Sequence, residues 1–237
     1  KVGTKGNLIA ITREMIINDD LDAFTKLARA LARSAGRSIE SDVFELINAN
    51  AKMSDGKTLF HAEHKNLVTI GTNINSDSVE AMRVLMTKQK DISGNDYLDI
   101  RPTLLLVPTN LAGIARTTIK SEYHVGTDRT DNTIPNIARD LVEVIDTPRL
   151  SGNAWYLLAE PNEAPCFEVV FLDGVQEPFL DQEESFKSDG VTYKVRLDYG
   201  VGIVDSVGGV KNPGKQTRLN RSNHSWQIII GKTVMCL

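Results

Sequence analysis

The strongest constraint on the fold is a β-patterned segment that runs through an acidic turn into one very long amphipathic helix. Residues 7–17 are mostly apolar and rich in β-branched types, which predicts one strand or a bent pair of strands. Asn18, Asp19 and Asp20 then offer side-chain acceptors to the free N–H groups of a first helical turn. The sequence therefore predicts that a helix begins here.

Apolar residues keep a helical period for the next thirty or so residues, so we expect one helix over residues 20–51. Such a helix is about 45 Å long, which exceeds the diameter of a small domain. We expect one side of it to pack against strands near residues 192–204. The residues predicted for that side are Leu21, Phe24, Leu31, Ile39, Val43 and Leu46. The same pattern also fits a helix that crosses the core of an ordinary large α+β domain.

Composition narrows the class of protein. A chain of 237 residues with 41% hydrophobic and 24% charged residues is of ordinary globular type. A formal net charge of −4 argues against a dedicated nucleic-acid binder, whose affinity would come from clustered Lys and Arg. We expect no membrane span, no signal peptide and a cytoplasmic setting. Cys166 and Cys236 are the only cysteines, so neither a disulfide framework nor a cysteine zinc site is indicated.

The rest of the chain predicts a mixed α/β middle and a second half that is mostly sheet. An amphipathic helix is expected over residues 76–88, and Asn110 is expected to cap another that ends near Ile119. Residues 121–137 are expected to form a loop. The predicted strands cover residues 100–108, 141–145, 155–158, 167–172, 192–197 and 201–204.

No group of residues makes a persuasive active site. His61 and His64 are three residues apart, whereas the zincin motif needs a spacing of four, and no third metal ligand is evident. Asp181, Glu183 and Glu184 are predicted to lie in a solvated charged loop, with no apolar shell to separate their pKa values. We therefore predict that the chain is not an enzyme and holds no metal or cofactor.

Several stretches in order resemble the major capsid proteins of tailed bacteriophages, specifically the Mu-like major head subunit group. The stretches are GTKGNLIAITREMIINDD (3–20), TLFHAEHKNL (58–67), WYLLAEP (155–161), FLDGVQEP (171–178), YKVRLDYGVGIVD (193–205) and KNPG (211–214). The resemblance covers about residues 1–214 and rests on the order of the segments rather than on any one motif.

The resemblance implies an α+β fold of the Hong Kong 97 type, with a long spine helix, a peripheral domain, an axial domain and an extended loop. It maps residues 1–17 to the returning part of the extended loop and 18–70 to the peripheral domain with its spine helix. Residues 71–171 become the axial domain and 172–214 the return strands of the peripheral domain. Residues 215–237 form a C-terminal tail without an assignment. Family members also carry an N-terminal arm and an outgoing loop strand, and because this chain starts at Lys1 we expect it to be a product of cleavage or truncation.

The function implied is that of a structural subunit which assembles in the host bacterial cytoplasm into the icosahedral shell of a virion. Its partners would be copies of itself in pentamers and hexamers, a portal, a prohead protease, and packaged double-stranded DNA bound without sequence specificity. An encapsulin-type nanocompartment shell is the alternative. A hydrolase, or the remnant of a fused prohead protease, is a third reading.

The resemblance places residues 1–17 between subunits. The segment is apolar, and Gly3, Gly6 and the acidic turn are expected to separate it from the globular body. Folded alone, it would leave large side chains poorly covered. The predicted contact residues are Ile9, Ile11, Met15 and Ile17.

Overall fold

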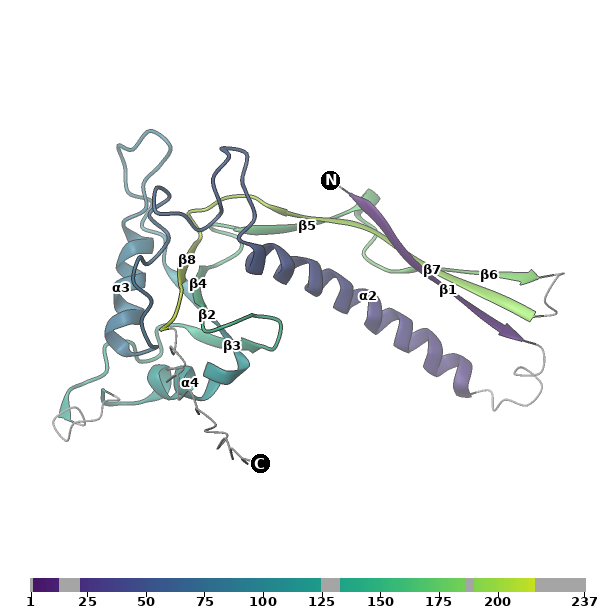
Figure 1. Cartoon of the computed structure of the whole chain (residues 1–237), viewed down its shortest axis with the longest axis horizontal. Helices are drawn as coiled ribbons and strands as arrows, with labels where there is room; N and C mark the ends of the chain where they lie inside the picture. The colour runs from purple at the N-terminus through teal and green to yellow at the C-terminus, as the bar shows by residue number, and fades with distance from the viewer. Residues whose placement is uncertain (1, 13–21, 125–132, 186–189, 216–237) are drawn as a thin grey trace, which may run out of the picture.

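The computed structural model describes residues 2–12, 22–124, 133–185 and 190–215; side chains at positions 9, 11–12, 22–29, 31–32, 184–185 and 190 lie outside the description. Figure 1 shows an elongated molecule in which a long helix lies beside an extended sheet, and a more compact α/β body lies at one end. The elements run from strand to helix to a mixed body and then to strands. The predicted α+β class, with a mixed α/β middle, is confirmed.

The long helix, α2 (Asp22–Ala49), is continuous, as predicted. It ends where Asn50 takes a φ of 46°, a left-handed conformation that Asn tolerates after a helix. The Asn50 side chain also exchanges two hydrogen bonds with the backbone of Phe60, at 3.0 and 2.8 Å. The helix is thereby fixed to the segment that follows it.

The extended sheet is built around β7 (Gly190–Ile203). On one side, β1 (Gly3–Thr12) pairs antiparallel with it along the whole length of β1. On the other side, β5 (Phe167–Phe171) and β6 (Phe179–Ser185) pair with it one after the other, joined by the short helix η3 (Leu172–Gly174). We call the sheet of β1, β5, β6 and β7 the arm sheet.

Two predictions about the arm sheet are wrong. The two strands expected over residues 192–197 and 201–204 form the single strand β7, because Gly200 pairs in register with Val170 instead of ending the strand. The charged loop expected at Asp181 to Glu184 is strand β6, which hydrogen-bonds to β7 although its described side chains are exposed. Backbone pairing, rather than burial, holds β6 in place.

The α/β body contains a second sheet with the strand order β3-β2-β4-β8. Its strands are β2 (Pro102–Pro108), β3 (Glu143–Thr147), β4 (Trp155–Ala159) and β8 (Gly209–Asn212). The helices α3 (Ser76–Thr87) and α4 (Ala112–Lys120) cover it, around a core that includes Met82, Leu105 and Trp155. The predicted helices and strands of this region are present, with ends shifted by a few residues.

The start of α4 differs from the prediction. Asn110 lies in a preceding short helix, η1 (Thr109–Leu111), and the cap position falls on Leu111 without a side-chain hydrogen bond. The Asn110 amide instead donates to Asn153 Oδ1 at 3.2 Å. Asn110 therefore joins two loops of the body rather than capping the helix.

A second apolar cluster joins α2 to the body. Its members are Ile47, Leu59, Phe60, Leu106, Leu150 and Tyr156. The Phe60 and Tyr156 rings lie 5.2 Å apart at an interplanar angle of 50°. Because Val43 and Phe167 pack against the same cluster, it connects the helix, the body and the base of the arm sheet.

Candidate subunit-contact surfaces

The arm sheet and α2 are joined by a polar contact. The Lys5 ammonium on β1 donates to the Asp42 carboxylate on α2, at 2.7 Å to Oδ1 and 2.5 Å to Oδ2. The buried Tyr199 hydroxyl on β7 donates to Asp42 Oδ2 at 2.8 Å. One carboxylate thus ties the helix to two strands.

The same contact sets the ionisation of its members. Burial of the Asp42 carboxyl opposes its ionisation, but the hydrogen bonds from Lys5 and Tyr199 outweigh burial, so the pKa of Asp42 is lowered. The hydrogen bond to Asp42 raises the pKa of Lys5. The Asp42 carboxylate and the Lys5 ammonium are both charged at neutral pH, and their electrostatic contact is strongest when both are charged.

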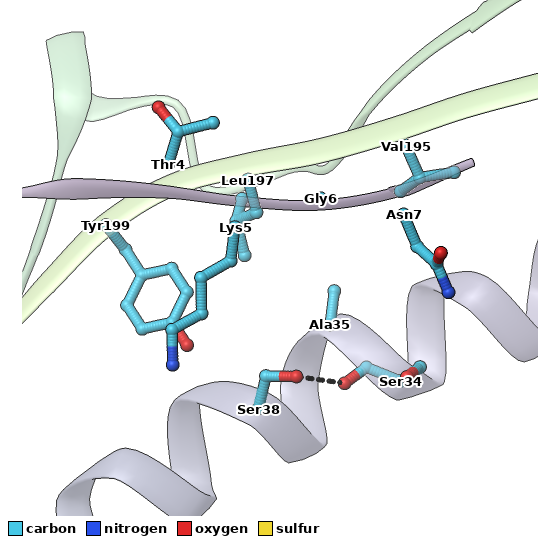
Figure 2. A pocket seen from close by; sticks show the side chains of 10 residues that line it. All are labelled: Thr4, Lys5, Gly6, Asn7, Ser34, Ala35, Ser38, Val195, Leu197 and Tyr199. Atoms are coloured by element: carbon cyan, nitrogen blue, oxygen red, sulfur yellow. Dashed lines mark hydrogen bonds between the residues drawn. The ribbon is translucent and has the colours of Figure 1, made fainter.

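The seam between α2 and the arm sheet is not closely packed. A cavity of about 470 Å³ lies between them, and Figure 2 shows Ser34, Ala35 and Ser38 on the helix facing Val195 and Leu197 on the sheet. A second cavity of about 410 Å³ lies next to Asp42 and Tyr199. Among the described side chains, the contact of Asp42 with Lys5 and Tyr199 therefore joins the helix to the sheet here, beside the buried Val195 and Leu197.

Six residues of the predicted long helix were expected to pack together against the sheet, and the structure places the described ones in different surroundings. Val43 packs against the cluster that joins α2 to the body, Leu46 lines the second cavity beside the arm sheet, and Ile39 is partly exposed. Leu21 and the side chains of Phe24 and Leu31 lie outside the described residues. Whether these six residues form one packing surface stays a prediction.

Sequence reasoning missed the role of Asp42. The available signal was its position in the helix, since it lies three residues after Ile39 and four before Leu46, within the stripe expected to be apolar. A carboxylate at such a position requires a partner. The two partners, Lys5 and Tyr199, are distant in the sequence and could not be identified from it.

The predicted contact segment is only partly described. Ile9 and Ile11 lie in β1, where they pair in register with Tyr193 and Val191, and their side chains are outside the description, as are Met15 and Ile17 altogether. The expectation that this segment is separate from the globular body is wrong for β1. Backbone hydrogen bonding to β7 holds β1 in the sheet despite Gly3 and Gly6.

The described residues of β1 are nevertheless exposed from Gly3 to Leu8 and at Ala10. Leu8 exposes 64% of its surface. Within the described residues, β1 pairs only with β7, so its outer edge has no partner. A strand edge of this kind can accept another chain.

The two histidines have structural contacts. His64 Nε2 lies 2.8 Å from Asp55 Oδ2, and its Nδ1 lies 3.0 Å from the Leu59 carbonyl oxygen. His61 Nδ1 accepts a hydrogen bond from the Glu63 backbone N–H. Among the residues that the structure describes, no group of three or more His, Cys, Asp or Glu side chains could hold a metal ion.

Cys166 is buried, and burial raises the pKa of its thiol to about 12. A thiol in this state is a poor nucleophile at neutral pH. Across the described helices, none has the length and apolar character needed to cross a membrane.

The comparisons with solved structures define the fold. A structure from Mycobacterium phage Che8 aligns with a TM-score of 0.53 at 11% identity, over 90% of this chain and 72% of that one. One from Microbacterium phage Oxtober96 aligns with a TM-score of 0.58 at 10% identity, over 90% and 73%. The holo-SrpI encapsulin complex from Synechococcus elongatus PCC 7942 aligns with a TM-score of 0.58 at 12% identity, over 92% and 75%. The chain therefore has the Hong Kong 97-type fold that phage capsids and encapsulins share.

The family follows from the sequence model described as phage capsid protein, which matches residues 1–212. The chain belongs to this family and is a structural, non-enzymatic component of a virion. No curated protein sequence matches it.

Proposed function

We propose that the chain is the major head subunit of a tailed bacteriophage or prophage of the Mu-like group. In this role many copies form pentamers and hexamers and close into an icosahedral shell around double-stranded DNA. The single observation that carries the role of capsid subunit is the family match over residues 1–212. The elongated form seen in Figure 1 agrees with that role, and the Mu-like assignment rests on the resemblance of the sequence segments. An elongated subunit has a large surface for burial against several neighbours, as a closed shell requires.

The net charge of the chain supports a role as a container rather than as a DNA-binding protein. The net charge is −4, so the chain as a whole lacks the excess of Lys and Arg that would grip packaged DNA. A portal and a prohead protease are the further partners that we propose.

An encapsulin-type shell remains a second candidate because the SrpI encapsulin complex aligns with the chain as closely as the phage structures do. The fold does not separate the two functions, and the family match favours the capsid. We infer the division into peripheral domain, axial domain and extended loop from the resemblance of the segments; the spine helix of that scheme corresponds to α2.

Electron microscopy of the full-length product, expressed with its genomic neighbours, tests the proposal. We expect closed shells that carry a portal and contain DNA. Small uniform shells without portal or DNA would identify a nanocompartment, and the absence of any shell would contradict both functions.

A further inference from the structure

One side of the arm sheet carries a concentration of carboxylates. The sequence has eight acidic residues and no Lys or Arg between Leu150 and Phe186. Five of them are exposed on β5, η3, β6 and the segment before β6, and none of the five forms an ion pair with another described residue. These five are Glu168, Asp173, Glu177, Asp181 and Glu183. We call this surface, residues 168–183, the acidic arm edge.

The acidic arm edge also exposes large apolar side chains. They are Val170, Leu172, Val175, Phe179 and Leu180, each between 44% and 57% exposed. Single exposed apolar residues are common on protein surfaces, but five within eleven residues is a high density of the kind that marks a contact site. Phe179 and Leu180 are consecutive in β6, so they expose apolar surface on both faces of this edge. In the described part of the chain, β6 pairs only with β7, which leaves the outer edge of β6 open next to these side chains.

Two cations of β7, Arg196 and Lys194, face the acidic arm edge in strand register. Arg196 is already engaged, because its guanidinium lies 4.7 Å from the centre of the Phe179 ring and 4.0 Å from Asp198. Lys194 faces Asp181 in strand register, but no ion pair joins them. The carboxylates of the edge are therefore available to an outside partner.

A basic surface lies on α2. Lys26, Arg29, Arg33 and Arg37 follow one another at spacings of three and four residues, which places these positions along one side of a helix. No acidic residue occurs between Asp22 and Glu40. The side chains of Arg33 and Arg37 are exposed, and neither has an ion-pair partner among the described residues. We call these four positions the basic helix stripe.

We propose that the acidic arm edge of one subunit docks on the basic helix stripe of a second copy of the chain. The proposal rests on the proposed function and adds to it the identity of two matching contact surfaces. The two surfaces are complementary in charge. Arg33 and Arg37 on one surface, and the five carboxylates on the other, form no ion pair among the described residues, so the two surfaces do not pair with each other there.

The proposed contact joins different surfaces on the two copies, so it is heterologous and can close into a ring. Exposed ion pairs contribute little stability each, whereas the five apolar side chains provide surface to bury. The charges therefore select the partner and its orientation, and the apolar side chains hold it.

Charge reversal tests the contact in the full-length chain. The helix reversal is Arg33→Glu with Arg37→Glu, the arm reversal is Glu177→Lys with Glu183→Lys, and a third variant combines both. We expect each reversal alone to lower the fast-sedimenting, assembled fraction about tenfold or more, because like charges then face each other. The combined variant restores the parent's value.

The matched control for the helix reversal is Lys52→Glu with Lys88→Glu, which makes the same charge change at exposed positions outside both surfaces. It assembles like the parent. Far-UV circular dichroism establishes that each subunit is folded. If a reversal unfolds the subunit, a neutral variant that carries both Arg33→Gln and Arg37→Gln takes its place. We expect the assembly of this variant to depend less on salt concentration than the assembly of the parent does.

Three results would overturn the proposal and leave the proposed function standing. Either reversal alone could give the same assembled fraction as the parent, or the combined variant could stay as unassembled as each reversal alone. The third is a neutral variant whose assembly depends on salt as strongly as that of the parent. Failure of the parent chain itself to assemble would instead contradict the proposed function.

Discussion

Asp42 is the residue whose replacement tests most directly how the arm sheet is held on the long helix. Asp42→Ala removes the acceptor of both Lys5 and Tyr199. The Tyr199 hydroxyl is buried, so loss of its partner costs about 1–2 kcal/mol. The Lys5 side chain is 53% exposed, so solvent screens the ion pair and its loss costs under about 1 kcal/mol. We therefore expect a total loss of about 1–3 kcal/mol in the free energy of unfolding.

Urea unfolding of the unassembled subunit at neutral pH measures this loss as a lower midpoint. Asp42→Asn is the matched control, because its amide oxygen can still accept from Tyr199 while the ion pair is gone. It is expected to lose about 1 kcal/mol. Equal midpoints for Asp42→Ala and the parent would refute the conclusion that the polar contact holds the seam.

The pH dependence gives a second check on Asp42. The pKa of its carboxyl is lower in the folded protein than the value of about 3.9 expected in the unfolded chain. The stabilisation is therefore present above about pH 4 and is lost as the pH falls through the folded-state pKa. We expect the stabilities of the parent and Asp42→Ala to converge in acid; a constant difference down to the lowest pH at which both stay folded would contradict the argument.

Three further predictions concern the shell, the core and the histidines. Ile9→Asp with Ile11→Asp in the full-length precursor is expected to give folded but unassembled subunits, seen as slow sedimentation with unchanged circular dichroism; complete shells would contradict a role between subunits. Phe60→Ala is expected to cost about 3–5 kcal/mol in urea unfolding, because Phe60 is buried against Tyr156, whereas Phe60→Leu costs under about 2 kcal/mol; equal losses would refute the packing argument. His61→Ala with His64→Ala is expected to leave metal content unchanged, and zinc that survives chelation only in the parent would refute this.

Local patterns in the sequence predict the α/β body and the long helix well. The apolar period of α2 and the proline-bounded run of β2 are strong signals, because burial on one side or on both sides leaves a regular pattern. The arm sheet was predicted less accurately. In β6, Asp181 and Glu183 are exposed, so no alternation of apolar and polar residues marks the strand.

The contact surfaces could be predicted only in part, because they depend on residues that come together from distant parts of the chain. Asp42 is a visible exception within an apolar stripe, but its partner Tyr199 is 157 residues away. Asn110 has the residue type of a helix cap, yet its side chain bonds to Asn153 after a short helix precedes α4. Tertiary contacts decided both cases.

Electron cryomicroscopy of particles assembled from the full-length chain tests the central claim most directly. We expect closed icosahedral shells in which α2 and the arm sheet of each subunit lie against neighbouring copies. Particles without closed symmetry, or shells in which the arm sheet touches no other subunit, would contradict it.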